Sequence, residues 1–223
     1  MMMTAAGPAP AAKCFILGAG VPGLQALATA RRMGAIVTAT DVRPATKEQV
    51  ESLGAKFLAV EDDEFKQAQT AGGYAKEMSK EYQAKQAALT ASHIAKQDIV
   101  ITTALIPGRP APKLISVDMV RSMRPGSVII DLAVERGGNC ELAKPGEVVV
   151  TDNGVKIVGH LNIAGRLAAT ASSLYAKNLF SFLETMIDKE SKSLSIKWDD
   201  ELVQATLLTR DGAIVHPNFK PAA

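Results

Sequence analysis

The sequence predicts an α/β protein, a Rossmann-type doubly wound parallel sheet, followed by a C-terminal segment that belongs to an incomplete second α/β domain. Two observations favour this fold class: short apolar runs alternate with segments of helical periodicity, and a glycine-rich turn separates the first run from the first such segment. Past residue 146 the pattern changes to paired short strands and one long helix. We therefore expect a linker at 1–12, a dinucleotide-binding domain at 13–146 and a flanking-domain segment at 147–223.

The first element is also the most informative. KCFILGAGVPGLQALATARRMGAIVTATD, residues 13–41, consists of an apolar strand, a glycine turn, a helical segment, a second apolar strand and an acid. Gly18 permits the tight turn, Gly20 lets a pyrophosphate approach the backbone, and Gly23 lets the helix pack closely on the strand. The helix N-terminus offers unpaired N–H groups and a partial positive charge to phosphates. The stretch predicts a dinucleotide site.

An acid closes this stretch. Asp41 follows Gly23 by 18 residues, where a carboxylate at the end of the second strand can bind both ribose hydroxyls. Such a carboxylate repels a 2′-phosphate, so the sequence favours NAD(H) over NADP(H). Arg43 weakens this inference, because an arginine nearby could accept a 2′-phosphate.

The next two elements are a helix and a strand. Pro44 begins a helical segment over 44–53, and Gly54 is suited to ending it. The apolar run KFLAV at 56–60 reads as the third strand. The acidic run EDDE at 61–64 is typical of a solvated edge. Gly73 and Tyr74 follow in a polar segment, and an ordinary loop and a lid that folds over a ligand both remain open there.

The central part continues the alternation. A long helical pattern over 75–96 leads to a fourth strand at 98–103, and three prolines then enforce a rigid loop over 104–112. Open α/β sheets bind ligands at this carboxyl edge of the strands. Ser116 can cap a short helix at 117–123, and 127–131 is the fifth strand. For Asp131 at its end, strand-end hydrogen bonding and a role in the site both remain open.

The C-terminal part has a different pattern. The turn Asp152-Asn153-Gly154 between two apolar runs indicates a paired strand or hairpin within 147–158. A long helix is expected over 165–187, an alternating edge strand over 193–198 and a hairpin over 206–215. Isolated hairpins are marginally stable, so we expect this part to pair with a second domain or another subunit.

Composition excludes several other classes. The formal net charge is only +2 and aromatic residues make up 4%, which argues against a nucleic-acid partner. Neither a secretion signal nor a run of 18 apolar residues is present, so no transmembrane helix is expected. Cys14 and Cys140 have no CxxC neighbours and indicate a reducing compartment, with Cys14 expected as a buried apolar residue. The three histidines lack metal-ligand spacing, so no metal site is predicted.

Several long stretches together resemble one family. GAGVPGLQA, TATDVRPATKEQVESLGAKF, TAGGYAKEM, DIVITTALIPGRPAP, MRPGSVIIDLAVERGGN and TRDGAIVHP are similar to the NAD(H)-binding component of proton-translocating NAD(P) transhydrogenases, the alpha subunit's domain I. Alanine dehydrogenase is the nearest relative of that fold. The resemblance implies that a hydride passes between NAD(H) on this component and NADP(H) on a partner component, coupled by a membrane component to proton movement. It also implies a homodimer at the cytoplasmic side of the bacterial inner membrane.

The resemblance also implies particular roles for residues. Beyond the three glycines, it assigns NAD contacts to residues of four loops: Val21, Asp41, Val42, Arg43, Gly73 and Leu105. Tyr74 corresponds to the tip of the family's mobile loop, which closes over the nucleotide. No catalytic side chain is expected, because hydride transfer between two nicotinamides needs no protein acid or base; the protein supplies proximity and orientation.

One family feature has no match in this sequence. Family members carry a further N-terminal domain, with a loop of arginine, glutamine and aspartate beside the nicotinamide ring. We therefore expect NAD(H) binding, but not hydride transfer by this chain alone. Two alternatives remain: a truncated NAD-binding module without turnover, and an oxidoreductase of the alanine dehydrogenase type. The second is less favoured because no substrate-binding domain precedes the glycine turn.

Overall fold

A seven-stranded sheet forms the centre of the larger of two compact units. The computed structural model describes residues 2–68, 78–106 and 108–219. In the order β5-β4-β3-β6-β7-β9-β8, every neighbouring pair is parallel except β8 with β9. The strands are β3 (Lys13–Leu17), β4 (Ile36–Thr40), β5 (Lys56–Phe57), β6 (Ile99–Thr102), β7 (Val128–Asp131), β8 (Val148–Val150) and β9 (Lys156–Val158). The predicted α/β fold with a Rossmann-type parallel sheet is confirmed.

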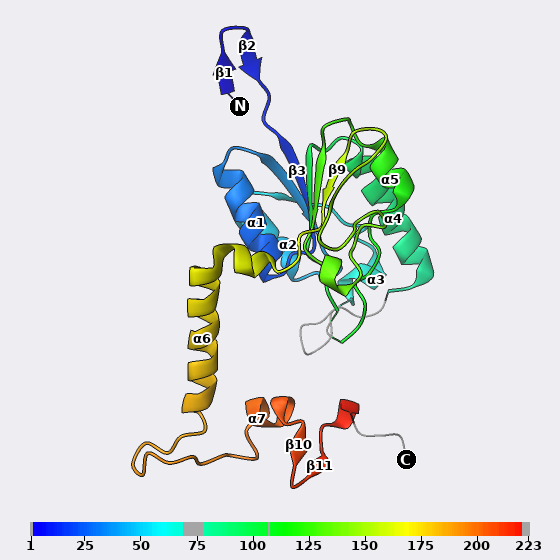
Figure 1. The fold of residues 1–223 in the computed structure, drawn as a ribbon. Coiled ribbons are helices and arrows are strands. Elements are labelled where there is room, and N and C mark those ends of the chain that lie inside the picture. Colours follow the sequence, from blue (N-terminus) through cyan, green and yellow to red (C-terminus); the bar gives the residue numbers. More distant parts are fainter. Residues whose placement is uncertain (1, 69–77, 107, 220–223) are drawn as a thin grey trace. The chain divides into compact units, whose positions relative to one another are not determined.

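The helices of this unit lie between the strands in sequence and on both sides of the sheet in space (Figure 1). They are α1 (Val21–Arg32), α2 (Thr46–Ser52), α3 (Asp63–Lys66), α4 (Lys80–Ile94) and α5 (Val117–Ser122). Ser116 caps α5, as expected, by accepting from Met119 N at 3.3 Å. The acidic run is only in part a solvated edge, because Asp62 caps α3 by accepting from the N–H of buried Phe65 at 3.0 Å.

Side chains of β3 alternate between two hydrophobic cores, as the two-residue period of a strand requires. Cys14 and Ile16 belong to a cluster with α1 and α2, whereas Phe15 and Leu17 pack with α4 and α5. All four side chains are at least 98% buried. β3 is therefore covered on both faces, which explains its unbroken apolar sequence. Cys14 is the buried apolar residue expected, and burial raises the pKa of its thiol to about 11.

The hairpin formed by β8 and β9 belongs to the sheet. β9 pairs in parallel with β7, with Ile129 opposite Ile157, and β8 extends the sheet edge in antiparallel orientation. The sequence pattern placed these strands in the flanking segment, whereas the compact unit that contains the sheet ends at Leu161 rather than at residue 146. The first residues also differ from the expected linker, because β1 (Met2–Thr4) and β2 (Gly7–Ala9) pair as a short antiparallel hairpin.

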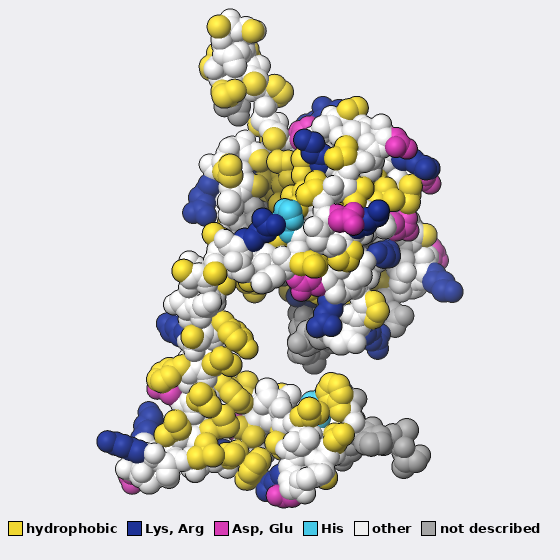
Figure 2. Space-filling model, in the orientation of Figure 1, with side chains coloured by type: hydrophobic (Ala, Val, Ile, Leu, Met, Phe, Trp, Pro, Cys, Tyr) yellow, Lys and Arg dark blue, Asp and Glu magenta, His cyan; other side chains and the backbone are white. Residues whose placement is uncertain are grey.

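The second compact unit spans Asn162–Ala223. Its elements are η2 (Ile163–Leu167), α6 (Ala168–Glu184), α7 (Glu201–Thr206), β10 (Thr209–Arg210), β11 (Ala213–Ile214) and η3 (Pro217–Phe219). The long helix and the last hairpin are confirmed. The edge strand expected at 193–198 is wrong, because only an isolated bridge between Ile187 and Leu194 forms there. Among the described residues none in α6 is buried, and Figure 2 shows hydrophobic side chains along its visible face. No helix in the described part of the chain is long and apolar enough to cross a membrane.

Candidate dinucleotide-binding site

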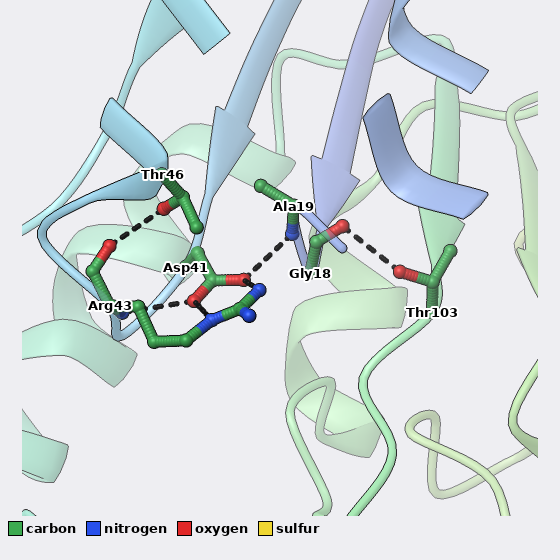
Figure 3. A network of polar contacts seen from close by, with 6 residues as sticks. All are labelled: Gly18, Ala19, Asp41, Arg43, Thr46 and Thr103. Atoms are coloured by element: carbon green, nitrogen blue, oxygen red, sulfur yellow. Dashed lines mark hydrogen bonds and ion pairs between the residues drawn. The ribbon is translucent and has the colours of Figure 1, made fainter. Parts of the chain in front are cut away.

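The glycine turn follows β3 and leads directly into α1. Gly18 has φ +104°, a left-handed conformation that favours glycine. Its N–H donates to Thr40 O at 2.9 Å, and its carbonyl accepts from Thr103 Oγ1 at 2.9 Å. Strands β3, β4 and β6 are thus joined at their carboxyl ends by contacts to one residue (Figure 3). The expected strand–turn–helix arrangement is present.

The three glycines of the turn have different surroundings. A Cβ on Gly23 would collide with the Gly18 carbonyl oxygen, and one on Gly18 would lie 2.7 Å from Thr103 Oγ1. Among the described residues, a Cβ on Gly20 would meet nothing closer than Pro22 Cδ at 3.9 Å, and the φ of Gly20, −77°, suits any residue. Packing within the protein therefore explains Gly18 and Gly23 but not Gly20. The space over Gly20 is what a pyrophosphate would need in order to approach the backbone.

The backbone N–H groups at the start of α1 are available to a ligand. Within the described part of the chain no side chain caps this helix end, and its first turn contains no acid. Pro22 lies in the first turn, where its missing N–H costs no hydrogen bond. Val21 is 86% exposed. Because unpaired N–H groups and the helix dipole favour negative charge, these features fit a dinucleotide's phosphates.

Asp41 lies beside the glycine turn, at the end of β4. Its side chain is only 7% exposed and holds Ala19 N at 2.8 Å and Arg43 N at 2.9 Å. The Arg43 guanidinium also donates to both carboxylate oxygens, from Nε at 2.9 Å and from Nη2 at 3.0 Å (Figure 3). Hydrogen bonding to Asp41 raises the pKa of Arg43 above its usual value. The structure thus places the predicted acid and the neighbouring arginine together.

The loop after β6 forms the opposite side of the glycine turn. Leu105 is 53% exposed there. Behind it, the fully buried Asn139 amide accepts from Ala104 N at 3.1 Å and donates to the carbonyls of Ala104 and Pro112 at 2.9 and 2.8 Å. Asn139 and Thr103 are two positioning residues that the sequence alone did not single out. Thr103 is a polar residue directly after β6, and this position could have drawn attention to it, whereas Asn139 lies in the longer loop after β7, where no local pattern marks it.

Asp131 has a structural role. It is 1% exposed and accepts hydrogen bonds from Thr102 Oγ1 at 3.1 Å, Ala133 N at 2.9 Å and Cys140 N at 2.9 Å. These bonds decide the open alternative in favour of strand-end hydrogen bonding. Val42 is half-buried between Asp41 and Arg43. Gly73 and Tyr74 lie outside the described residues, so their assignments stay predictions.

His93, in the last turn of α4, is half-buried and packs against β3 and β4. Its Nε2 is 2.8 Å from Thr38 Oγ1, and its ring meets Phe15 edge-on with 4.8 Å between centroids. Burial lowers the pKa of His93, with nearby Lys96 contributing in the same direction. His93 therefore has a packing role.

A parallel sheet with this glycine turn, an open helix N-terminus and an acid after the second strand defines a Rossmann-type dinucleotide-binding fold. The particular family follows from comparison with known proteins. The family model described as "Alanine dehydrogenase/PNT, C-terminal domain" matches residues 1–217, and the chain belongs to this family.

Matches to individual proteins support the same family assignment. The chain is 62% identical over 217 residues to a protein of the NAD(P) transhydrogenase alpha subunit of Rhodospirillum rubrum, covering 97% of this chain and 56% of that protein. A transhydrogenase crystal structure from Sinorhizobium meliloti matches with a TM-score of 0.81 and 64% identity, covering 96% of this chain and 56% of the other. An L-alanine dehydrogenase structure matches with a TM-score of 0.61 and 26% identity over 93% of this chain and 51% of the other. The chain thus spans about half the length of these relatives.

Replacing Gly20 with alanine is expected to weaken NADH binding at least tenfold, about 1.4 kcal/mol, because the added methyl group would lie where the pyrophosphate meets the backbone. The free energy of unfolding should change by no more than about 0.5 kcal/mol, since the surroundings have room for the methyl group. NADH fluorescence titration and urea denaturation of the same preparation measure the two quantities. An unchanged dissociation constant would contradict this placement of the phosphates.

Proposed function

We propose that this chain is the NAD(H)-binding component of a proton-translocating NAD(P) transhydrogenase. In this proposal a hydride passes directly between NAD(H) held here and NADP(H) held on a partner component. The observation that carries it is the open space over Gly20, between an uncapped helix N-terminus and the Asp41 carboxylate. The 62% identity to a transhydrogenase alpha-subunit protein supports the choice among dinucleotide-binding proteins.

The residues of the chain bind and orient the nucleotide in this proposal. Backbone N–H groups at the start of α1 hold the pyrophosphate, and Asp41 accepts from the ribose hydroxyls and favours NAD(H) over NADP(H). Further contacts come from residues beside these groups and from two other loops: Val21, Val42, Arg43, Gly73, Tyr74 and Leu105. The bound nicotinamide supplies the hydride chemistry, so no side chain of this chain is assigned as acid or base.

The proposed assembly includes further components. The chain would act with an NADP(H)-binding component and a membrane component, as a homodimer at the cytoplasmic side of the bacterial inner membrane. Residues 162–223 would complete a flanking domain whose other part lies outside this sequence. The uncovered apolar side chains of α6, among them Leu174 and Phe180 at 62% and 60% exposure, support the assignment of this segment to a larger domain.

Substitution of Asp41 by alanine is expected to raise the NADH dissociation constant about 10- to 100-fold, or about 1.4–2.8 kcal/mol, because charge-assisted hydrogen bonds to the ribose are lost. Discrimination against NADPH should also decrease, since the repelling carboxylate is gone while Arg43 remains. Fluorescence titrations with NADH and NADPH measure both effects. Asp118→Ala is the matched control, because Asp118 forms a surface ion pair with Arg121 on α5 and no other ion pair among the described residues. Equal affinity of Asp41→Ala and wild type for NADH would refute the assignment of this site.

Turnover distinguishes the proposal from its two alternatives. Mixed with the NADP(H)-binding component, the protein should pass hydride from NADPH to an NAD analogue. The change in the absorbance of the analogue measures this transfer. Saturable NADH binding without any transfer would favour a binding module. NADH oxidation that depends on pyruvate and ammonium, without a partner, would favour the alanine dehydrogenase type, for which the structural match to L-alanine dehydrogenase is the supporting observation.

A further inference from the structure

The Asp41 carboxylate has no acceptor position left over in this structure. A carboxylate offers about four lone-pair sites. Two are used by backbone N–H groups, from Ala19 to Oδ2 and from Arg43 to Oδ1. The other two are used by the Arg43 guanidinium, from Nε to Oδ1 and from Nη2 to Oδ2. A ribose that binds Asp41 must therefore replace one of these two pairs of donors.

The backbone pair is fixed by its surroundings. Ala19 lies in the turn between Gly18 and Gly20, and Gly18 is held on both sides by β4 and β6. The carbonyl of Arg43 accepts from Thr46 Oγ1 at 2.7 Å, which ties this part of the backbone to the start of α2. Displacing either backbone N–H would distort the glycine turn or the helix. The Arg43 side chain, 28% exposed, is the donor that can move.

The guanidinium also lies where a nucleotide would have to approach. Its Nη2 is 4.0 Å from the position that a Cβ on Gly20 would take, so it lies beside the open space over that residue. Two neighbouring N–H groups of arginine form a planar fork that matches a carboxylate bidentately. The vicinal 2′- and 3′-hydroxyls of a ribose also form a pair of donors, and they can match the same two oxygens.

We propose that the Arg43 guanidinium is a placeholder for the adenosine ribose, which occupies the ribose positions on Asp41 in the nucleotide-free protein and leaves them when the dinucleotide binds. The inference rests on the proposed function, in that the ligand is NAD(H). The exchange keeps the nearly buried carboxylate hydrogen-bonded in both states. It also makes Arg43 a determinant of affinity, because the ribose must compete with a side chain of the same chain.

Arginine Nε–Hε resonances of the ¹⁵N-labelled protein test the exchange. The Arg43 cross-peak is assigned by its absence from Arg43→Lys. On saturation with NADH it should move away from its position in the nucleotide-free protein as the guanidinium leaves Asp41, while the amide protons of Ala19 and Arg43 remain protected from exchange with solvent. An Arg43 Nε–Hε resonance that stays in place while the glycine-turn amides shift would overturn the inference. If no resonance responds to NADH, the proposed function fails, and the inference fails with it.

Arg43→Lys also separates the guanidinium fork from its charge. The variant keeps the positive charge near the pyrophosphate but cannot match both oxygens of Asp41 from two fixed donors. It should therefore bind NADH about 2- to 5-fold more tightly than wild type. Arg121→Lys, whose side chain pairs with Asp118 on the surface of α5, is the matched control and should leave the affinity unchanged. Unchanged or weaker NADH binding by Arg43→Lys would overturn the placeholder role.

Discussion

Replacing Gly23 with alanine is expected to destabilise the protein by about 2 kcal/mol, because overpacking against backbone costs close to the upper end of about 1–3 kcal/mol and alanine's better helix propensity recovers at most about 1 kcal/mol. The added Cβ would collide with the carbonyl oxygen of Gly18, which is backbone and already accepts from Thr103 Oγ1. Relief therefore requires α1 to move away from β3. The melting temperature should fall by roughly 4–8 °C in thermal unfolding followed by circular dichroism.

Gly20→Ala is the matched control for this substitution, since the same change three residues earlier meets no close neighbour in the part of the chain that the structure describes. The two variants should separate stability from binding: Gly23→Ala loses both, whereas Gly20→Ala loses mainly NADH affinity. Equal melting temperatures of Gly23→Ala and wild type would show that the close approach of α1 to the turn is not needed.

Asp131→Ala is expected to lower the free energy of unfolding more than Gly23→Ala does, by about 3–5 kcal/mol. Truncation would leave three donors without their acceptor: Thr102 Oγ1 and the N–H groups of Ala133 and Cys140. Water cannot easily replace the carboxylate, because Asp131 is 1% exposed. Urea denaturation measures the free energy of unfolding, and the melting temperature should fall by roughly 6–20 °C.

Asp98→Ala provides the comparison for Asp131. Asp98 also lies beside a sheet strand and accepts from Lys13 N and Arg124, but its side chain is 39% exposed. Its removal should cost no more than about 1 kcal/mol, because water can satisfy the donors left behind. The folded fraction of Asp131→Ala should bind NADH as wild type does. A weaker affinity in folded protein at unchanged stability would place Asp131 in the site after all.

The local sequence pattern predicted those elements that can be identified from consecutive residues alone. Buried apolar runs such as CFIL identify β3, and Gly54 identifies the end of α2 with φ +78°. Membership of β9 in the sheet depends instead on pairing with β7, about 28 residues earlier, which no local pattern encodes. The alternating segment 193–198 shows the converse, since a strand pattern forms no strand without a partner. Helix α7 was missed although Asp200 caps it, accepting from Leu202 N and Val203 N.

The site could be predicted from the sequence at positions where its geometry requires a particular type of residue. Glycines at three fixed positions and the acid after β4 were found for that reason, and the structure brings them together. The motif assigned a different role to each glycine, but it could not show which atoms surround each of them, because these include residues far away in the sequence, such as Thr103 beside Gly18. It also could not show the pairing of Arg43 with Asp41, which is a choice of side-chain rotamer.

The position of β3 has a consequence for the time at which the site can form during synthesis. β3 is the first strand of the sheet in the sequence, but its two neighbours are β4 and β6. The hydroxyl that fixes the Gly18 carbonyl belongs to Thr103, 85 residues further on. A nascent chain therefore cannot complete the turn until more than a hundred residues have left the ribosome, and its central strand stays unpaired on one side until then.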